Sequence, residues 1–111
     1  MTHTYIKNYQ SPTWMHLRNL SPRSMFDWIS NNPELGRVDV CINNAGLSTS
    51  ETLLEGNMES WKRMLDVNVL ALCLCTQLSI KSMVSNNVTD GQIIMISSFS
   101  GHRVPPNPST R

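Results

Sequence analysis

Three groups of polar residues are the candidates for chemistry in this sequence. They are the run Asn43-Asn44-Ala45-Gly46, the single Asn68 inside an apolar stretch, and a cluster of serines between positions 97 and 100. Taken alone, each has an ordinary structural explanation, because Asn and Gly tolerate positive φ angles in turns and serines are common in loops. His102 is a weak candidate for the base of a serine nucleophile, since no carboxylate stands near it. Their order along the chain is therefore more informative than any one of them.

The elements before the first polar group are a helix and a strand. Ser21 is a favourable N-cap and Pro22 suits the first position of a helix, which residues 31–33 (Asn-Asn-Pro) would end. In residues 37–43, RVDVCIN, apolar and other side chains alternate, and this pattern predicts a short strand. The Asn-Asn-Ala-Gly run would then be a turn directly after that strand.

The elements around the other two groups are a long helix and a second strand. Asn57 would cap a helix over Met58–Ser85, whose apolar residues cover more than one stripe. Such a helix is usually buried on more than one side, by a sheet and by another helix or subunit. The apolar run 92–96, QIIMI, is typical of a parallel strand covered on both faces. The order helix, strand, long helix, strand predicts an α/β fold.

Composition excludes several classes of function. Of the 111 residues, 40% are hydrophobic and 15% are charged, with a net charge of +1. These values fit a globular chain and provide no electrostatic footprint for nucleic acid. The longest apolar stretch, residues 67–75, contains Asn68 and falls short of the ~20 residues that span a bilayer, so no transmembrane segment is expected.

The three cysteines indicate neither a disulfide framework nor a metal site. Their number is odd, and Cys73 and Cys75 lie on different sides of the predicted helix. We expect these two cysteines and Cys41, the third, to be small buried side chains, and we expect no bound metal. Reduced thiols suit the cytoplasm, which is the location we expect.

The ends of the chain differ from its middle. Residues 1–20 show no clear period and are expected to be disordered. Residues 105–111 contain Pro105, Pro106 and Pro108 and are expected to form an extended tail. The organised part of the chain is therefore expected between these two segments.

Three segments together are characteristic of a known family. DVCINNAGL at 39–47, DVNVLAL at 66–72 and SGHRV at 100–104 occur in the order and setting found in the short-chain dehydrogenase/reductase family. The sequence resembles that family from about Leu20 to Val104. The resemblance implies that residues 21–104 are the central part of a Rossmann-like domain, a doubly wound parallel sheet with helices.

The resemblance also implies a reaction and the residues that serve it. The activity would be reduction of a carbonyl or oxidation of an alcohol in a small-molecule substrate. The cofactor would be NADP(H), with NAD(H) as the alternative. Asn44, Ala45 and Gly46 would contact the cofactor, and Asn43 would brace the sheet. Asn68 would interrupt the helical backbone and hold a water of the proton relay. The Ser98 hydroxyl would donate a hydrogen bond to the carbonyl oxygen, which gains charge during hydride transfer.

Two parts of the family's site are not found in these residues. The family's Tyr-x-x-x-Lys follows the serine at a distance that falls beyond Arg111, and neither Tyr5 nor Tyr9 has a lysine four residues later. The five glycines are too far apart to form the glycine-rich turn that holds a pyrophosphate. We therefore expect the chain alone to be inactive, to bind cofactor poorly and to be marginally stable or prone to aggregate.

Two other functions remain open. The chain could be a non-catalytic product that forms homo- or hetero-oligomers with full-length family subunits through helix 58–85. It could also be a product without a function.

Overall fold

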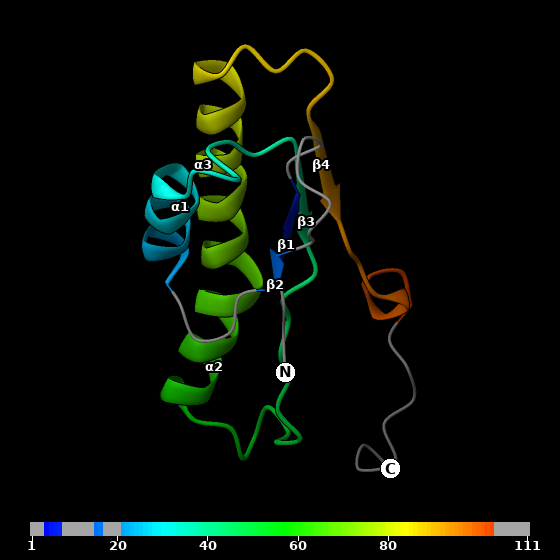
Figure 1. Cartoon of the computed structure of the whole chain (residues 1–111). Coiled ribbons are helices and arrows are strands. Elements are labelled where there is room, and N and C mark those ends of the chain that lie inside the picture. The colour runs from blue at the N-terminus through cyan, green and yellow to red at the C-terminus, as the bar shows by residue number, and fades with distance from the viewer. Residues whose placement is uncertain (1–3, 8–14, 17–20, 104–111) are drawn as a thin grey trace.

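Among the residues that the structure describes, four strands form a sheet in the order β2-β1-β3-β4. The computed structural model describes residues 4–7, 15–16 and 21–103, and the predicted tail 105–111 lies outside them. The strands are β1 (Thr4–Lys7), β2 (Met15–His16), β3 (Val40–Asn43) and β4 (Gln92–Met95). Figure 1 shows the helices labelled α1, α2 and α3 on one side of this sheet.

The pair β3–β4 is parallel, with Val40 opposite Gln92 and Asn43 opposite Met95. The long helix between these strands makes the connection an α/β crossover, so the predicted fold class is confirmed. The sheet is mixed, however, because β1 pairs antiparallel with β3 and with β2.

The prediction of disorder over residues 1–20 is wrong for β1 and β2, and the rest of that segment lies outside the described residues. Pairing with β1 covers the edge of β3 that would otherwise be open. Strands of two to four residues carry little periodic signal, and their formation depends on the partner they meet in the folded chain.

Helix α1 (Pro22–Asn31) begins and ends where the sequence predicts. The Ser21 side chain accepts a hydrogen bond from the backbone N–H of Ser24 at 3.2 Å, and Asn32 caps the other end. Its buried side chains, Met25, Phe26 and Ile29, recur at helical spacing. This face therefore anchors α1 to the rest of the molecule.

The long helix consists of α2 (Met58–Leu65), a π-helical segment η1 (Asp66–Ala71) and α3 (Leu72–Ser85). Asn57 caps it by accepting a hydrogen bond from Ser60 N–H at 2.9 Å. At the other end, Asn87 has a φ of 53° and the N–H of Val88 donates to the Met83 carbonyl at 2.9 Å. This is the geometry of a Schellman motif, so the predicted limits of the helix are confirmed.

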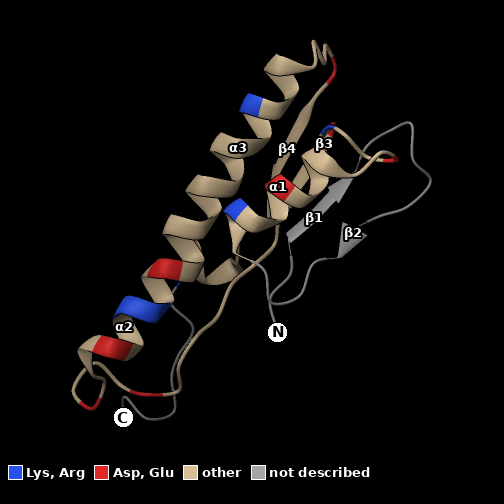
Figure 2. Ribbon diagram, turned by 60° about the vertical axis from the view of Figure 1, so that its left-hand side comes forward, with Lys and Arg blue, Asp and Glu red and all other residues tan. Residues whose placement is uncertain are grey.

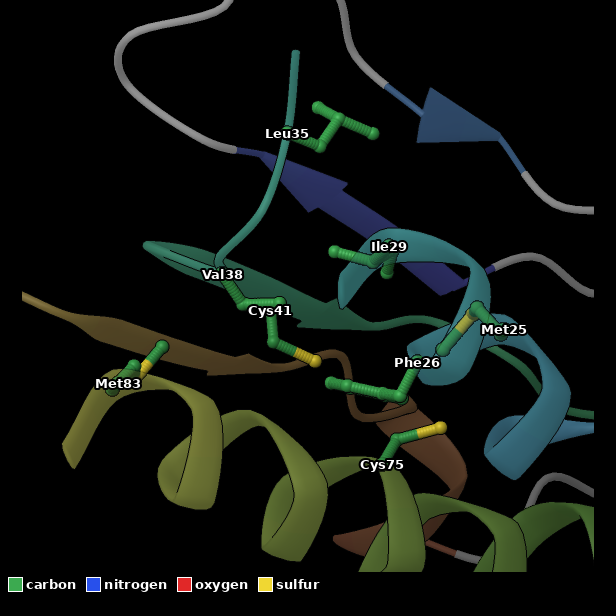
Figure 3. Close-up of a cluster of buried hydrophobic side chains, with 8 residues drawn as sticks. All are labelled: Met25, Phe26, Ile29, Leu35, Val38, Cys41, Cys75 and Met83. Carbon is green, nitrogen blue, oxygen red and sulfur yellow. The ribbon is translucent and has the colours of Figure 1, made fainter. Parts of the chain in front are cut away.

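The hydrophobic core lies between α1, β3 and α3 (Figure 3). Phe26 from α1, Cys41 from β3 and Cys75 from α3 are among its members, and the complete cluster is Met25, Phe26, Ile29, Leu35, Val38, Cys41, Cys75 and Met83. Cys41 and Cys75 are buried as predicted, whereas Cys73 is exposed. The prediction for Cys73 is wrong because its side of α3 has no neighbour among the described residues.

The helix Met58–Ser85 is long and apolar enough to cross a membrane, by length and composition alone. It has 28 residues and a mean hydropathy of 1.5 over its most apolar window, and core helices of soluble proteins pass the same test. Residues 67–75, which are too short to span a bilayer, are only part of this apolar helix, because the helix continues through Asn68. In this structure α3 lies on the sheet, and the hydroxyl of Ser82 accepts a hydrogen bond from Val38 N–H at 3.1 Å.

Candidate active site

The candidate site lies at the edge of the sheet where β3 and β4 both end. Asn43 is opposite Met95 in the last register pair, and the N–H of Ile96 donates to the Asn43 carbonyl at 3.0 Å. The turn 44–46 and the serines 97 and 98 therefore leave the sheet at the same carboxyl edge (Figure 1). Ligands of open α/β sheets bind outside this edge.

Asn43 links three elements beneath that edge. Its side chain is buried, and Nδ2 donates to Oγ1 of Thr76 in α3 at 2.9 Å and contacts Sδ of Met95 in β4 at 3.3 Å. The thiol of Cys41 lies 3.7 Å from its Oδ1. A buried amide must have partners, and these hold β3, β4 and α3 at fixed spacing. The geometry agrees with the bracing role implied for Asn43.

Asn68 is tied to the chain that follows the turn. Its Oδ1 accepts a hydrogen bond from the N–H of Leu47, and its Nδ2 donates to the carbonyl of Leu47, both at 2.8 Å. A Cβ placed on Gly46 would lie 3.7 Å from Oδ1, so the turn and the helix are in close contact there. The side chain of Asn68 therefore positions the turn.

The backbone around Asn68 is π-helical from Asp66 to Ala71. A π-helical turn interrupts the regular hydrogen-bond ladder and is frequently found at functional sites. The interruption expected at Asn68 is thus present in the structure. That its backbone holds a water of a proton relay stays a prediction.

Ser98 is exposed just after β4. Its Oγ accepts a hydrogen bond from Ser100 N–H at 3.2 Å and caps the short helix η2 (Phe99–Gly101), which leaves the hydroxyl hydrogen free to donate. Among the described residues, no hydrogen bond joins Ser98 to the turn or to Asn68. The structure therefore brings Asn68 to the turn. It places Ser98 at the same edge of the sheet, without a hydrogen bond to the turn or to Asn68 among the described residues.

The site is built from neutral groups. Residues 44–47 and 96–101 contain no charged side chain, and Figure 2 shows the charged residues spread over α1, the long helix and connecting loops. Within the described ranges, no three His, Cys, Asp or Glu side chains form a group that could hold a metal ion. Burial raises the pKa of the Cys41 thiol beneath the site, and the nearby Ser79 hydroxyl partly opposes this effect, so the thiol form is favoured. The available chemistry is hydrogen bonding by amides and hydroxyls.

Comparison with known proteins decides the family. Residues 22–109 match the family model described as short chain dehydrogenase. The chain belongs to the short-chain dehydrogenase family. The match covers both parallel strands, the long helix and every candidate site residue.

Individual relatives agree with this assignment. The chain is 58% identical over 69 residues to human dehydrogenase/reductase SDR family member 11, covering 62% of this chain and 26% of the relative. It is 40% identical over 81 residues to farnesol dehydrogenase of Aedes aegypti, covering 72% and 32%. The solved structure of ElxO with NADP bound superposes with a TM-score of 0.63 at 31% identity, covering 77% and 33%. The chain thus spans about a quarter to a third of the length of these relatives.

Two residues that position the site were missed in the sequence. Leu47 takes part through its backbone N–H and carbonyl, for which a side-chain pattern carries no signal. Thr76 accepts a hydrogen bond from the side chain of Asn43. Thr76 follows Asn68 by about two helical turns, so the two residues lie on nearby sides of the predicted helix. That spacing was a usable signal, because a threonine on the sheet side of a helix needs a polar partner.

Proposed function

We propose that this chain carries the central part of the active site of an NADP(H)-dependent oxidoreductase that interconverts a carbonyl compound and an alcohol. The observation that supports it best is the clamp between Asn68 and Leu47, which holds the turn 44–46 at the carboxyl edge from which Ser98 also emerges. Membership of the family supports the reaction class, and the NADP bound by the similar protein ElxO supports the cofactor. We place the protein in the cytoplasm, where its free thiols would persist.

The residues present fit one side of a dinucleotide. Asn44 and Gly46 are exposed. Ala45 has only a methyl group and Gly46 has no side chain, so a ligand can approach the backbone closely. The bound nicotinamide would supply or accept the hydride. Ser98 would donate its hydroxyl hydrogen to the substrate oxygen as that oxygen gains charge. The sequence has no glycine-rich turn for the pyrophosphate and no Tyr-x-x-x-Lys, so we propose that the chain alone binds NADP(H) weakly and does not turn over.

The first test uses the purified chain. NADPH fluorescence should change little on addition of the protein, and absorbance of NADPH should not fall when aldehydes or ketones are added. Turnover that survives purification to homogeneity would contradict the proposal that the chain is inactive alone.

The second test asks whether these residues can serve the reaction. Residues 21–103 would replace the matching segment of the human relative, to which this chain is 58% identical where they align. We expect the chimera to oxidise or reduce substrates of that relative. Ser98→Ala should then lower kcat by about 10²–10³, the cost of removing one donor to a developing oxyanion. Ser100→Ala is the matched control, since its side chain is a neighbouring exposed hydroxyl, and equal losses in both variants would argue against the role of Ser98.

A second function is favoured by the exposed apolar side of the long helix. Leu65, Val69 and Leu70 are 59%, 46% and 60% exposed, and Ile80 and Val84 are 48% and 71% exposed. Such a surface suits a helix from another subunit. We therefore propose, as the alternative, that the chain associates with full-length family members through this helix.

Size-exclusion chromatography of the chain mixed with the complete human relative tests this alternative. Co-elution that is lost in Val69→Lys, and kept in Leu54→Lys, would support it. Leu54 is the control because it is 98% exposed in the loop before the helix. Separate elution of the two unmodified proteins would exclude the association.

A further inference from the structure

The pair Asp90-Gly91 lies in the loop that connects the long helix to β4. Both residues are exposed, α3 ends before them at Ser85, and β4 begins after them at Gln92. In the part of the chain that the structure describes, the Gly91 N–H donates no hydrogen bond and the Asp90 carboxylate forms no ion pair. An exposed carboxyl group therefore stands next to a backbone nitrogen that neither a helix nor a strand holds.

An aspartate followed by a glycine can react within its own backbone. The Gly91 nitrogen bonds to Cγ of the Asp90 carboxyl group in its protonated form, water leaves, and a five-membered succinimide ring closes. Water then adds to the main-chain carbonyl carbon of Asp90 and breaks its bond to the Gly91 nitrogen. The chain now runs through Cγ, so the product is isoaspartate, with the same atoms and the same oxidation state. Glycine favours this ring because it has no Cβ to hinder the attacking nitrogen.

The other three aspartates have surroundings that oppose this reaction. Asp27 lies within α1 and Asp66 within the π-helical segment η1, where helical hydrogen bonds hold the backbone. Asp39 is fully buried and lies 3.0 Å from the Arg37 guanidinium. Each of the three is followed by tryptophan or valine, whose side chains hinder ring closure. Asp90 alone combines exposure, an irregular backbone and a following glycine.

The loop around Gly91 is packed closely on one side. A Cβ placed on Gly91 would lie 2.7 Å from Sδ and 3.2 Å from Cγ of Met83, whose side chain is buried in the core. A larger residue at position 91 would have to displace this side chain. The next residue, Gln92, donates its N–H to the Asp39 carbonyl at 2.9 Å, where β4 first meets β3. An extra backbone carbon at position 90 therefore disturbs both contacts.

We propose that Asp90 isomerises to isoaspartate in the folded protein, and that the added backbone carbon weakens the start of the β3–β4 pairing. The reaction takes place within one chain and needs no co-reactant, because the water lost in the first step is regained in the second. The proposal is independent of the proposed function, since Asp90 precedes β4 whereas Ser98 follows it.

Storage of the purified chain in neutral buffer tests the site, with circular dichroism verifying that the helices are retained. Peptides from the stored chain are methylated by an isoaspartate-specific methyltransferase with S-adenosylmethionine, and mass spectrometry assigns the labelled position. Isoaspartate should accumulate at position 90 and at no other aspartate, at a rate close to that of the same chain unfolded in guanidinium chloride. Asp90→Glu should abolish the label, because glutamate would have to close a six-membered ring. Asp66→Glu is the matched control and should leave the label at position 90 unchanged.

Hydrogen exchange followed by NMR tests the consequence for the sheet. In the isomerised chain, separated from the unmodified chain by ion exchange, the Gln92 amide should exchange faster. The Ser60 amide, which is bonded to Asn57 at the far end of the long helix, should not change.

Three results would overturn the proposed site. They are no isoaspartate at position 90, equal amounts at Asp27 or Asp66, and a reaction at Asp90 that is far slower in the folded chain than in the unfolded one. Equal exchange at Gln92 in the isomerised and unmodified chains would overturn the proposed weakening of the strand pairing.

Discussion

The two halves of the long helix differ in how they are held. The C-terminal half, α3, buries Cys75, Ser79 and Met83 against the sheet and α1. The N-terminal half, Met58–Ala71, has no buried residue although it is also rich in apolar side chains. Figure 1 shows α1 and the sheet beside α3, while α2 extends beyond them.

This difference separates stability from the candidate chemistry. The packed half supplies the core, and Thr76 at its start holds the buried amide of Asn43. The exposed half contains Asn68, which is joined to the rest of the chain by two hydrogen bonds to Leu47. Burial therefore stabilises one half, and directional hydrogen bonds position the other.

The largest effect is expected from the core of the packed half. Phe26→Ala should lower the free energy of unfolding by about 3–5 kcal/mol, the usual cost of removing a buried aromatic side chain. Urea denaturation followed by circular dichroism measures it. Leu54→Ala, at a residue 98% exposed, is the control and should change stability by less than about 0.5 kcal/mol. Equal effects of the two substitutions would show that the core is not where the structure places it.

The next effect concerns the junction between the two halves. Thr76→Val keeps the shape of the side chain and removes the oxygen that accepts from Asn43, so a buried donor loses its main partner. We expect a loss of about 1–3 kcal/mol in the same denaturation experiment. Ser85→Ala removes an exposed hydroxyl of the same helix that bonds only to the Lys81 carbonyl, and should have little effect. A neutral Thr76→Val would mean that Asn43 is held by other groups.

In the exposed half, the effect of substitution should be local. Asn68→Ala removes both hydrogen bonds to Leu47, each worth about 0.5–1.5 kcal/mol, so amide exchange at Leu47 should accelerate about tenfold or more. Hydrogen exchange followed by NMR measures this residue directly. The control, Asn57→Ala, removes the helix cap and should affect the Ser60 amide instead. Unchanged exchange at Leu47 would contradict the clamp.

The smallest effect is a pH dependence of the packed half. Burial raises the pKa of the Cys41 thiol in the folded chain. Above the usual thiol pKa, near 8.5, the unfolded chain loses this proton while the folded chain keeps it, so stability should fall as the pH rises beyond that value. Cys41→Ala should reduce that slope, and Ser85→Ala, at an exposed hydroxyl that does not titrate, should not. A slope that survives in Cys41→Ala would assign it to another group.

Much of the fold was predictable because its signals are local. Ser21, Asn57 and the asparagines at 86 and 87 mark helix ends through hydrogen bonds to backbone groups a few residues away. The candidate site residues were also recognisable, since Asn43–Gly46 and Ser98 stand where strands end. The distinction between Cys73 and Cys75 was not, because it depends on which side of α3 meets a neighbour.

By itself, the sequence determined the order of the elements from α1 to β4, the ends of the helices, and the family to which the chain belongs. Only the tertiary structure decided that β1 adds antiparallel to β3, that Asn68 binds the backbone of Leu47, and that α2 has no covering layer among the described residues. The physical reason is distance along the chain. Caps and periodicity act over one or two helical turns, whereas strand pairing, the clamp and burial join residues far apart in sequence, and no local pattern specifies which of them meet.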